Sequence, residues 1–396
     1  MALLDHAPLV AGVAMPGGGV RHRFLLVDER GRLHAAEIDD VRSIHVKRRP
    51  AEGNCVAIAR QAQSRSLLLL AIPGVGGNLR AAQLRLLDDV SLELLATLPL
   101  RATEYPLSVV SAALYRLPPP PVEEQTPFFV VGTAFVLPSE SEPTNGRLLV
   151  CRVEKDARRL VVVCEQTFEG GCMAVAAFKG KILVGVNSEI HLLDFDPDSL
   201  ALQTLCKKAE DVCVTCLAVD EASETLAVGD ILRSVSLYKL TVECLCGRQL
   251  AQMEFVASEL VRRNVTAMER LPEDPQRLAV CDAYGNLSIM GVVEDKEIDR
   301  SNPQKRVVPL EWIHLDDQIN RFVVGSLFRS NAQKHGQALA LTEEEHTESA
   351  IQFNMVFCTV SGRIGLIGAI SDEEYAILRA LEDALNTVGA REGRYV

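Results

Sequence analysis

Two cysteine pairs have the clearest chemical potential in this sequence, Cys213-Val-Thr-Cys216 and Cys244-Leu-Cys246. Paired thiolates bind zinc when they converge on one point together with further ligands. On a strand, residues three apart point to opposite faces, so Cys213 and Cys216 would converge only at a bulge. Cys244 and Cys246 share a face, but no second ligand pair with zinc spacing accompanies them. We therefore expect structural thiols, with no metal site and no cofactor.

The remaining candidates for catalysis are equally weak. The eight histidines form neither HxH nor HExxH, and none lies beside a serine or cysteine in a recognisable nucleophile context. The glycine-rich stretch 74–77 lacks the Lys-Ser/Thr pair that completes a phosphate-binding loop. The sequence therefore predicts no catalytic residues and a protein that is not an enzyme.

Composition excludes several further classes. The 41 Lys and Arg residues face 53 Asp and Glu, a net charge of -12, which argues against the broad basic surface that grips nucleic acid directly. The 11 cysteines are odd in number and scattered, as expected of reduced thiols in the cytosol or nucleus. No apolar run is long enough to span a membrane, and residues 1–15 lack the basic start of a signal peptide. We expect a soluble intracellular protein.

The elements that would position any functional residue are short strands. In residues 127–154, two runs rich in Val, Phe and Leu flank a polar, acidic segment that ends at Asn145-Gly146, which predicts strand, loop and strand. Residues 224–238 repeat this pattern, with Gly229-Asp230 at the bend. Similar runs bounded by Gly, Asn, Asp or Pro recur throughout the chain.

This repetition predicts the fold class. Residues 50–365 show almost no helical periodicity, and blades of about 40 to 45 residues would give about seven over this length. A row of immunoglobulin-like sandwiches would show breaks in composition that are absent here. We predict an all-β fold, a closed seven-bladed WD-like β-propeller with a short C-terminal α-helix.

Three domains are expected on this basis. Residues 1–49 would be the remnant of a preceding propeller or linker, with a hairpin over 24–38 whose unpaired edge favours self-association. Residues 50–370 would form the propeller, and residues 371–396 would begin a helical segment. There Ser371 suits the N-cap, Glu374 completes a capping box, and apolar residues follow at helical spacing over 371–388.

Three charged residues could serve a binding surface. Glu140 and Glu142 alternate along the predicted loop and could project together, although acidic loops are often simply solvated. Arg233 follows Gly229-Asp230 and opens an apolar run, which places it near a propeller face, where partners bind. The alternative is that Arg233 only braces the loop after Gly229.

The sequence resembles the damaged-DNA-binding protein 1 family, which includes the largest subunit of the cleavage and polyadenylation specificity factor and a splicing-factor subunit. The resemblance rests on the stretches at 104–111, 128–147, 229–235, 319–322, 325–327 and 359–367, in collinear order over nearly the whole chain. Residues 38–50 resemble the link between the family's second and third propellers.

The resemblance implies a function as well as a fold. The chain would correspond to the third propeller of a non-catalytic ubiquitin-ligase adaptor in DNA repair, found in the nucleus and cytoplasm. Its partners would be the substrate receptors of cullin-4 ligases. It would reach cullin-4 only indirectly and damaged DNA only through a partner, and it would have no membrane contact.

The family's receptor-facing surface, carried over to matching positions, would consist of Ala134, Glu140, Glu142, Leu217, Arg233, Asn320 and Val360. The sequence departs from the family where larger apolar or aromatic side chains are usual, at Thr215, Ala218, Asn264, Gln318 and Arg321. Such apolar groups supply much of the contact energy in protein interfaces.

Two other functions are open at this point. A scaffold for RNA processing is the alternative that the sister families imply. A propeller that is itself an enzyme or binds nucleic acid directly is disfavoured by the lack of a metal cluster and of a basic groove.

Overall fold

The computed structural model describes residues 9–15, 22–28, 33–38, 53–74, 81–154, 158–209, 212–245, 248–295, 304–325 and 352–392. The chain divides into two compact units, Met1–Arg49 and Pro50–Val396. In the first unit, β1 (Leu9–Met15), β2 (His22–Asp28) and β3 (Leu33–Ile38) form one antiparallel sheet in that order. The hairpin predicted over 24–38 is confirmed as β2–β3, although its turn at 29–31 lies outside the described residues. β1 was not predicted.

Among its described residues, the second unit forms six antiparallel blades, five with four strands and the last with three. The first blade contains β4 (Asn54–Gln61), β5 (Ser66–Ile72), β6 (Gln83–Asp88) and β7 (Leu94–Pro99). The second contains β8 (Glu104–Ala113), β9 (Pro127–Phe135), β10 (Gly146–Glu154) and β11 (Arg159–Phe168), with the short 3-10 helix Val122–Glu124 between β8 and β9. The third contains β12 (Cys172–Phe178), β13 (Lys181–Val186), β14 (Glu189–Asp196) and β15 (Ala201–Ala209).

The remaining blades follow in the same way. The fourth contains β16 (Val214–Asp220), β17 (Thr225–Asp230), β18 (Ser234–Leu245) and β19 (Arg248–Ser258). The fifth contains β20 (Val265–Arg270), β21 (Leu278–Asp282), β22 (Asn286–Asp295) and β23 (Gln304–His314). The sixth contains β24 (Ile319–Val324), β25 (Gln352–Thr359) and β26 (Ile364–Ala369). One parallel pair, Ser258 with Arg306, joins the outer strands of the fourth and fifth blades.

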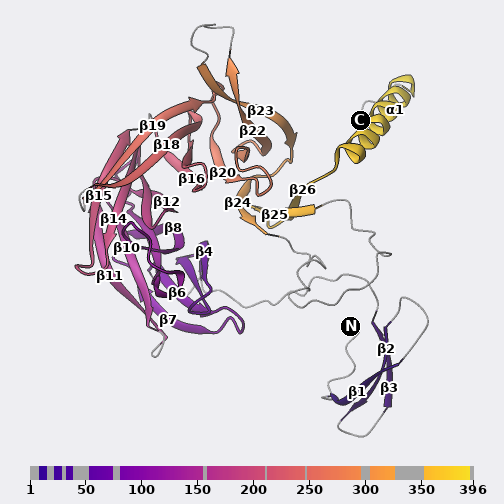
Figure 1. Cartoon of the computed structure of the whole chain (residues 1–396), viewed down its shortest axis with the longest axis horizontal. Helices are drawn as coiled ribbons and strands as arrows, with labels where there is room; N and C mark the ends of the chain where they lie inside the picture. Colours follow the sequence, from indigo (N-terminus) through magenta and orange to yellow (C-terminus); the bar gives the residue numbers. More distant parts are fainter. Residues whose placement is uncertain are drawn as a thin grey trace. The chain divides into compact units, whose positions relative to one another are not determined.

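Successive blades lie side by side in sequence order (Figure 1). The first strand of each blade contacts the first strand of the next, from β4 against β8 to β20 against β24, and the outer strands from β7 to β23 also form a series. Radial repetition of four-stranded sheets is the architecture of a propeller. The all-β propeller prediction is therefore confirmed. The number seven stays a prediction, because the structure describes six blades.

The strands of the inner blades bury both of their faces. In β9, Phe129 and Val131 belong to the core between the first and second blades, whereas Phe128 and Val130 belong to the core between the second and third. Alternate residues of a strand point to opposite faces. This is why these runs are apolar throughout and not alternating, as expected from the sequence.

The helix α1 (Asp372–Glu392) begins with the predicted capping box. The backbone N–H of Glu374 donates to Ser371 Oγ (3.3 Å), and the backbone N–H of Ser371 donates to Glu374 Oε2 (3.1 Å). Reciprocal bonds of this kind satisfy N–H groups that the first turn leaves without partners. The predicted start of the helix is thus confirmed to the residue.

The packing of β9 leads to a stability prediction. Phe129 is fully buried, so Phe129→Ala should lower the free energy of unfolding by about 3 to 5 kcal/mol through lost apolar contact and a cavity. Phe255→Ala is the matched control, because the Phe255 side chain is 53% exposed. Denaturant unfolding followed by circular dichroism measures both changes. Equal losses for the two variants would contradict the assignment of the core.

Candidate functional site

One end of the blades carries a repeated backbone contact. In five successive blades, the turn between the second and third strands donates a backbone N–H to the segment that leads into the same blade. The bonds are Val136 N to Thr103 O (2.9 Å), Asn187 N to Gly171 O (3.0 Å), Ile231 N to Cys213 O (3.1 Å), Ala283 N to Asn264 O (2.9 Å) and Val360 N to Gln318 O (2.9 Å). These turns and leading segments therefore share one surface, which we call the loop face.

Buried polar side chains fix the turns of the loop face. Asp230, 1% exposed, accepts the backbone N–H groups of Leu232 and Arg233 at Oδ1, both at 2.7 Å, and that of Cys213 at Oδ2 (2.8 Å). Asp282 accepts the backbone N–H groups of the following turn in the same way. Asp side chains favour such local bonds to backbone N–H groups. The turn tips are therefore held rigidly above the strands.

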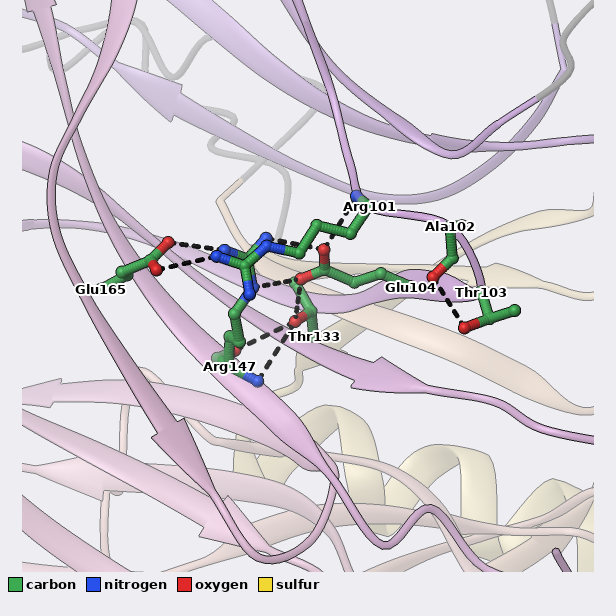
Figure 2. A network of polar contacts seen from close by, with 7 residues as sticks. All are labelled: Arg101, Ala102, Thr103, Glu104, Thr133, Arg147 and Glu165. Atoms are coloured by element: carbon green, nitrogen blue, oxygen red, sulfur yellow. Dashed lines mark hydrogen bonds and ion pairs between the residues drawn. The ribbon is translucent and has the colours of Figure 1, made fainter.

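A buried ion pair braces the loop face in the second blade (Figure 2). Arg147 donates from Nε to Glu104 Oε1 (2.9 Å) and from Nη2 to Glu104 Oε2 (2.6 Å). Thr133 Oγ1 also donates to Glu104 (2.6 Å), and Arg147 Nη1 reaches Glu165 (2.5 Å), which Arg101 contacts from the leading segment. The network links all four strands of the blade and flanks the acidic loop between β9 and β10.

The geometry shifts the pKa values of the pair in opposite directions. Burial alone would raise the pKa of Glu104, but hydrogen bonds from Arg147 and Thr133 outweigh it and hold this pKa below its ordinary value. Burial opposes the charge of Arg147 as well, and the bond and charge of Glu104 raise the pKa of Arg147 above its ordinary value. Both groups are therefore charged at neutral pH, which a fork-shaped bidentate pair favours.

The structure places four of the predicted site residues on the loop face. Glu140 is half-buried in the β9–β10 turn and accepts a hydrogen bond from Thr144 (3.0 Å), whereas Glu142 is exposed. Arg233 is exposed in the β17–β18 turn, and Val360 is 68% exposed in the β25–β26 turn. They come from three blades.

The other three predicted residues lie in strands. Asn320 is exposed at the start of β24, directly after a leading segment of the loop face. Leu217 is half-buried in β16 and packs on the core between the third and fourth blades. Ala134 is fully buried in β9, opposite Tyr105 and Gly146, so its side chain is not on a surface of this structure.

Several positions that depart from the family have structural contacts here. Thr215 Oγ1 donates to the Gly229 carbonyl (3.1 Å), and Gln318 Nε2 donates to the Ala283 carbonyl. Ala218 is buried, and Arg321 is exposed. The polar groups of Thr215 and Gln318 thus bond to the sheet and to a turn, at positions where larger apolar groups are usual in the family.

Sequence reasoning missed the apolar tips of the loop face. Exposed apolar residues on its turns and leading segments are Val136, Leu137, Leu232, Leu260, Val261, Tyr284 and Val360. A signal was present, because Leu232 and Tyr284 each stand two residues after the Asp that fixes their turn. An apolar residue in a turn whose backbone is capped by Asp has no core to enter, so it points to solvent.

The sequence predicts structural thiols; most of the cysteines that the structure describes are buried or half-buried, whereas Cys55, Cys244 and Cys358 are exposed. All the described cysteines are free, and burial raises the pKa of Cys216 to about 12. Cys213 donates its backbone N–H to Asp230, and Cys246 lies outside the described residues. Within the described ranges, no three His, Cys, Asp or Glu side chains gather as metal ligands, and no helix is long and apolar enough to cross a bilayer.

Removing the carboxylate of the ion pair gives a stability test. Glu104→Gln leaves Arg147 buried without its main counterion, so we expect the free energy of unfolding to fall by about 3 to 5 kcal/mol at neutral pH. The depressed pKa means that this stabilisation is present above the unfolded-state pKa of about 4.3 and is lost as pH falls through the folded-state value. Unfolding measured across acidic pH should therefore show a weaker pH dependence for the variant.

Glu154→Gln is the matched control for this test. The Glu154 carboxylate lies 3.5 Å from Arg159 Nη2, and both side chains are exposed. An exposed pair of this kind contributes about 1 kcal/mol or less. A similar loss for both variants would mean that the Glu104–Arg147 pair does not stabilise the blade as its burial indicates.

Comparison with known proteins identifies the family of the chain. The sequence model described as "CPSF A subunit region" matches residues 81–390. The chain is 28% identical over 370 residues to DNA damage-binding protein 1a of Arabidopsis thaliana, covering 92% of this chain and 31% of that protein. It is 26% identical over 371 residues to DNA damage-binding protein 1 of Solanum lycopersicum, with the same coverage. The chain thus spans just under a third of the length of these relatives, and it belongs to the family of the CPSF A subunit region.

Proposed function

We propose that this chain is a non-catalytic protein-interaction scaffold whose loop face binds a partner protein. The observation that carries the proposal is the set of exposed apolar tips on the loop face, contributed by separate blades whose turns are fixed by backbone hydrogen bonds. Contiguous apolar groups among charged residues are typical of protein-binding surfaces. A rigid backbone reduces the entropy lost on binding.

The family relationship supports a more specific role in DNA damage pathways. The chain would serve as the third propeller of an adaptor for cullin-4 ubiquitin ligases, in the nucleus and cytoplasm. Its loop face would bind substrate receptors, and its link to cullin-4 would be indirect. The net charge of -12 supports contact with damaged DNA through a partner and not directly.

A scaffold for RNA processing is the second candidate, because the matched family takes its description from the CPSF A subunit. Affinity capture with the full chain and mass spectrometry separates the two roles. Cullin-4 receptors among the captured proteins would support the first, and polyadenylation factors would support the second. Either result supports the proposal only if a variant with an altered loop face no longer captures the same protein.

Arg233→Ala is that variant. Loss of one member of a charge pair buried on binding costs about 2 to 5 kcal/mol, so we expect affinity for the partner to fall about thirtyfold or more. The melting temperature should not change, because Asp230 holds the turn through the backbone N–H of residue 233. The double variant Glu140→Ala/Glu142→Ala should also weaken binding.

Arg152→Ala is the control, because Arg152 is exposed on β10 and that strand leads away from the loop face. Isothermal titration with the purified partner measures affinity, and a thermal melt measures stability. If Arg233→Ala lowers stability and leaves affinity unchanged, Arg233 only braces its turn, and the proposed surface is wrong.

A further inference from the structure

One residue of the turn between β13 and β14 makes hydrogen bonds to segments of three blades. Asn187 Nδ2 donates to the carbonyl of Pro143 (2.9 Å), which belongs to the β9–β10 loop of the second blade. Asn187 Oδ1 accepts the backbone N–H of Gly171 (2.8 Å), which leads into the third blade. The Asn187 carbonyl accepts the backbone N–H of Val214 (2.8 Å), the first residue of the fourth blade. Asn187 therefore joins three neighbouring parts of the loop face.

The local backbone fits this role. Asn187 has a φ of 45°, in the left-handed region, where Asn is tolerated better than most other residues that carry a Cβ. Gly170, with a φ of 140°, packs against its amide, since a Cβ at Gly170 would lie 3.1 Å from Asn187 Cγ. A Cβ at Gly171 would lie 3.2 Å from the Pro143 Cβ. The two glycines thus leave the space in which Asn187 and the β9–β10 loop meet.

Hydrogen bonds within the β9–β10 loop set its shape but not its position. The backbone N–H of Glu140 donates to the Leu137 carbonyl (3.1 Å), and Thr144 Oγ1 donates to Glu140 Oε1 (3.0 Å). Both bonds would survive if the whole loop moved as one body. The bond from Asn187 to Pro143 joins the loop to the third blade, so it restrains that movement.

An independent observation shows that the loop approaches the fourth blade. Burial raises the pKa of the Cys213 thiol, and the charges of Asp230 and Glu142 raise it further. Cys213 lies in the segment that leads into the fourth blade, and its backbone N–H donates to Asp230, which also holds the turn of Arg233. Because such charge effects weaken with distance, Glu142 must lie near this segment.

We propose that Asn187 is a positioning residue of the loop face. It holds the β9–β10 loop, which carries Glu140 and Glu142, in a fixed place relative to the β17–β18 turn, which carries Arg233. A surface whose charged groups are already in place loses less conformational entropy on binding. The effect on binding rests on the proposed function, whereas the position of the loop can be measured without a partner.

Asn187→Asp tests the position of the loop in the full chain. Asp has nearly the same size and keeps the oxygen that accepts the Gly171 N–H, but its second oxygen cannot donate to the Pro143 carbonyl. We expect amide hydrogen exchange over residues 137–145, measured by mass spectrometry, to become about threefold to tenfold faster. The melting temperature should change little, because the backbone bonds of Asn187 remain.

Two further variants complete this measurement. Asn187→Gly suits the positive φ and lacks the amide, so it should speed exchange of the loop to a similar extent. Gln203→Glu is the matched control, because it makes the same change from amide to carboxylate on the same blade. Gln203 is exposed on β15 and pairs with Asp194, away from the turn of Asn187. This control should leave exchange over residues 137–145 unchanged.

The effect on binding is measured by isothermal titration with the protein that affinity capture identifies. Asn187→Asp should lower its affinity about threefold to tenfold, and Gln203→Glu should not change it. In the Glu140→Ala/Glu142→Ala background, Asn187→Asp should have little further effect, because the loop then has no carboxylate to position. Such non-additivity distinguishes a residue that acts through the loop from one that acts independently.

Several results would overturn the proposal. Unchanged exchange of the loop in both Asn187 variants would show that Asn187 does not position it. Faster exchange with unchanged affinity, or losses of affinity that simply add in the combined variant, would show that binding does not depend on that position. If no protein is captured, the proposed function fails, and the exchange measurement decides the role of Asn187 by itself.

Discussion

The structure depends on one constraint: most strands of the blades that lie between two other blades must bury both faces. In β10, Leu149 and Cys151 pack toward the first blade while Leu148 and Val150 pack toward the third. In a sheet with one solvated face, a shift by one residue would expose the apolar set, and this fixes the register. Here both sets are apolar, so burial alone discriminates poorly between the two registers. Something else must specify how these strands pair.

Polar contacts at the loop face supply that specification. The fork between Arg147 and Glu104 joins the third strand of the second blade to its first, and Thr133 of the second strand bonds to both residues. A shift by one residue would turn Arg147 toward the opposite core and leave Glu104 buried without a counterion. Leaving such a charge unpaired is strongly destabilising. The polar contacts that specify the strand register therefore also hold the turns. The position of the loop face and the pairing of the strands are fixed by the same interactions.

Local structural features could be predicted from the sequence much better than contacts between residues that are far apart in it. The strand–loop–strand unit at 127–154 and the capping box at Ser371 were predictable, because turn residues, β-branched runs and capping pairs act within a few residues. The pair of Glu104 and Arg147 was not, since the two residues are 43 positions apart and each alone reads as an ordinary surface charge. Ala134 shows the limit of carrying over a surface by resemblance. Whether a residue at the end of a strand is exposed or buried depends on the residues of the neighbouring blade that pack against it. The local sequence pattern does not identify those residues.

Net charge also proves a poor guide to the chemistry of one face. The chain carries twelve more acidic than basic groups, yet Glu259 and Asp282, beside the turns of the fourth and fifth blades, are buried and hold Arg263. Fixing turns with buried acids therefore has a second effect, since these carboxylates add no negative charge to the surface while apolar side chains such as Leu232 and Tyr284 are exposed there. Guanidinium groups beside apolar side chains are common at the energetic centres of protein interfaces. The buried acids that hold these turns rigid therefore also determine which side chains the loop face presents to solvent.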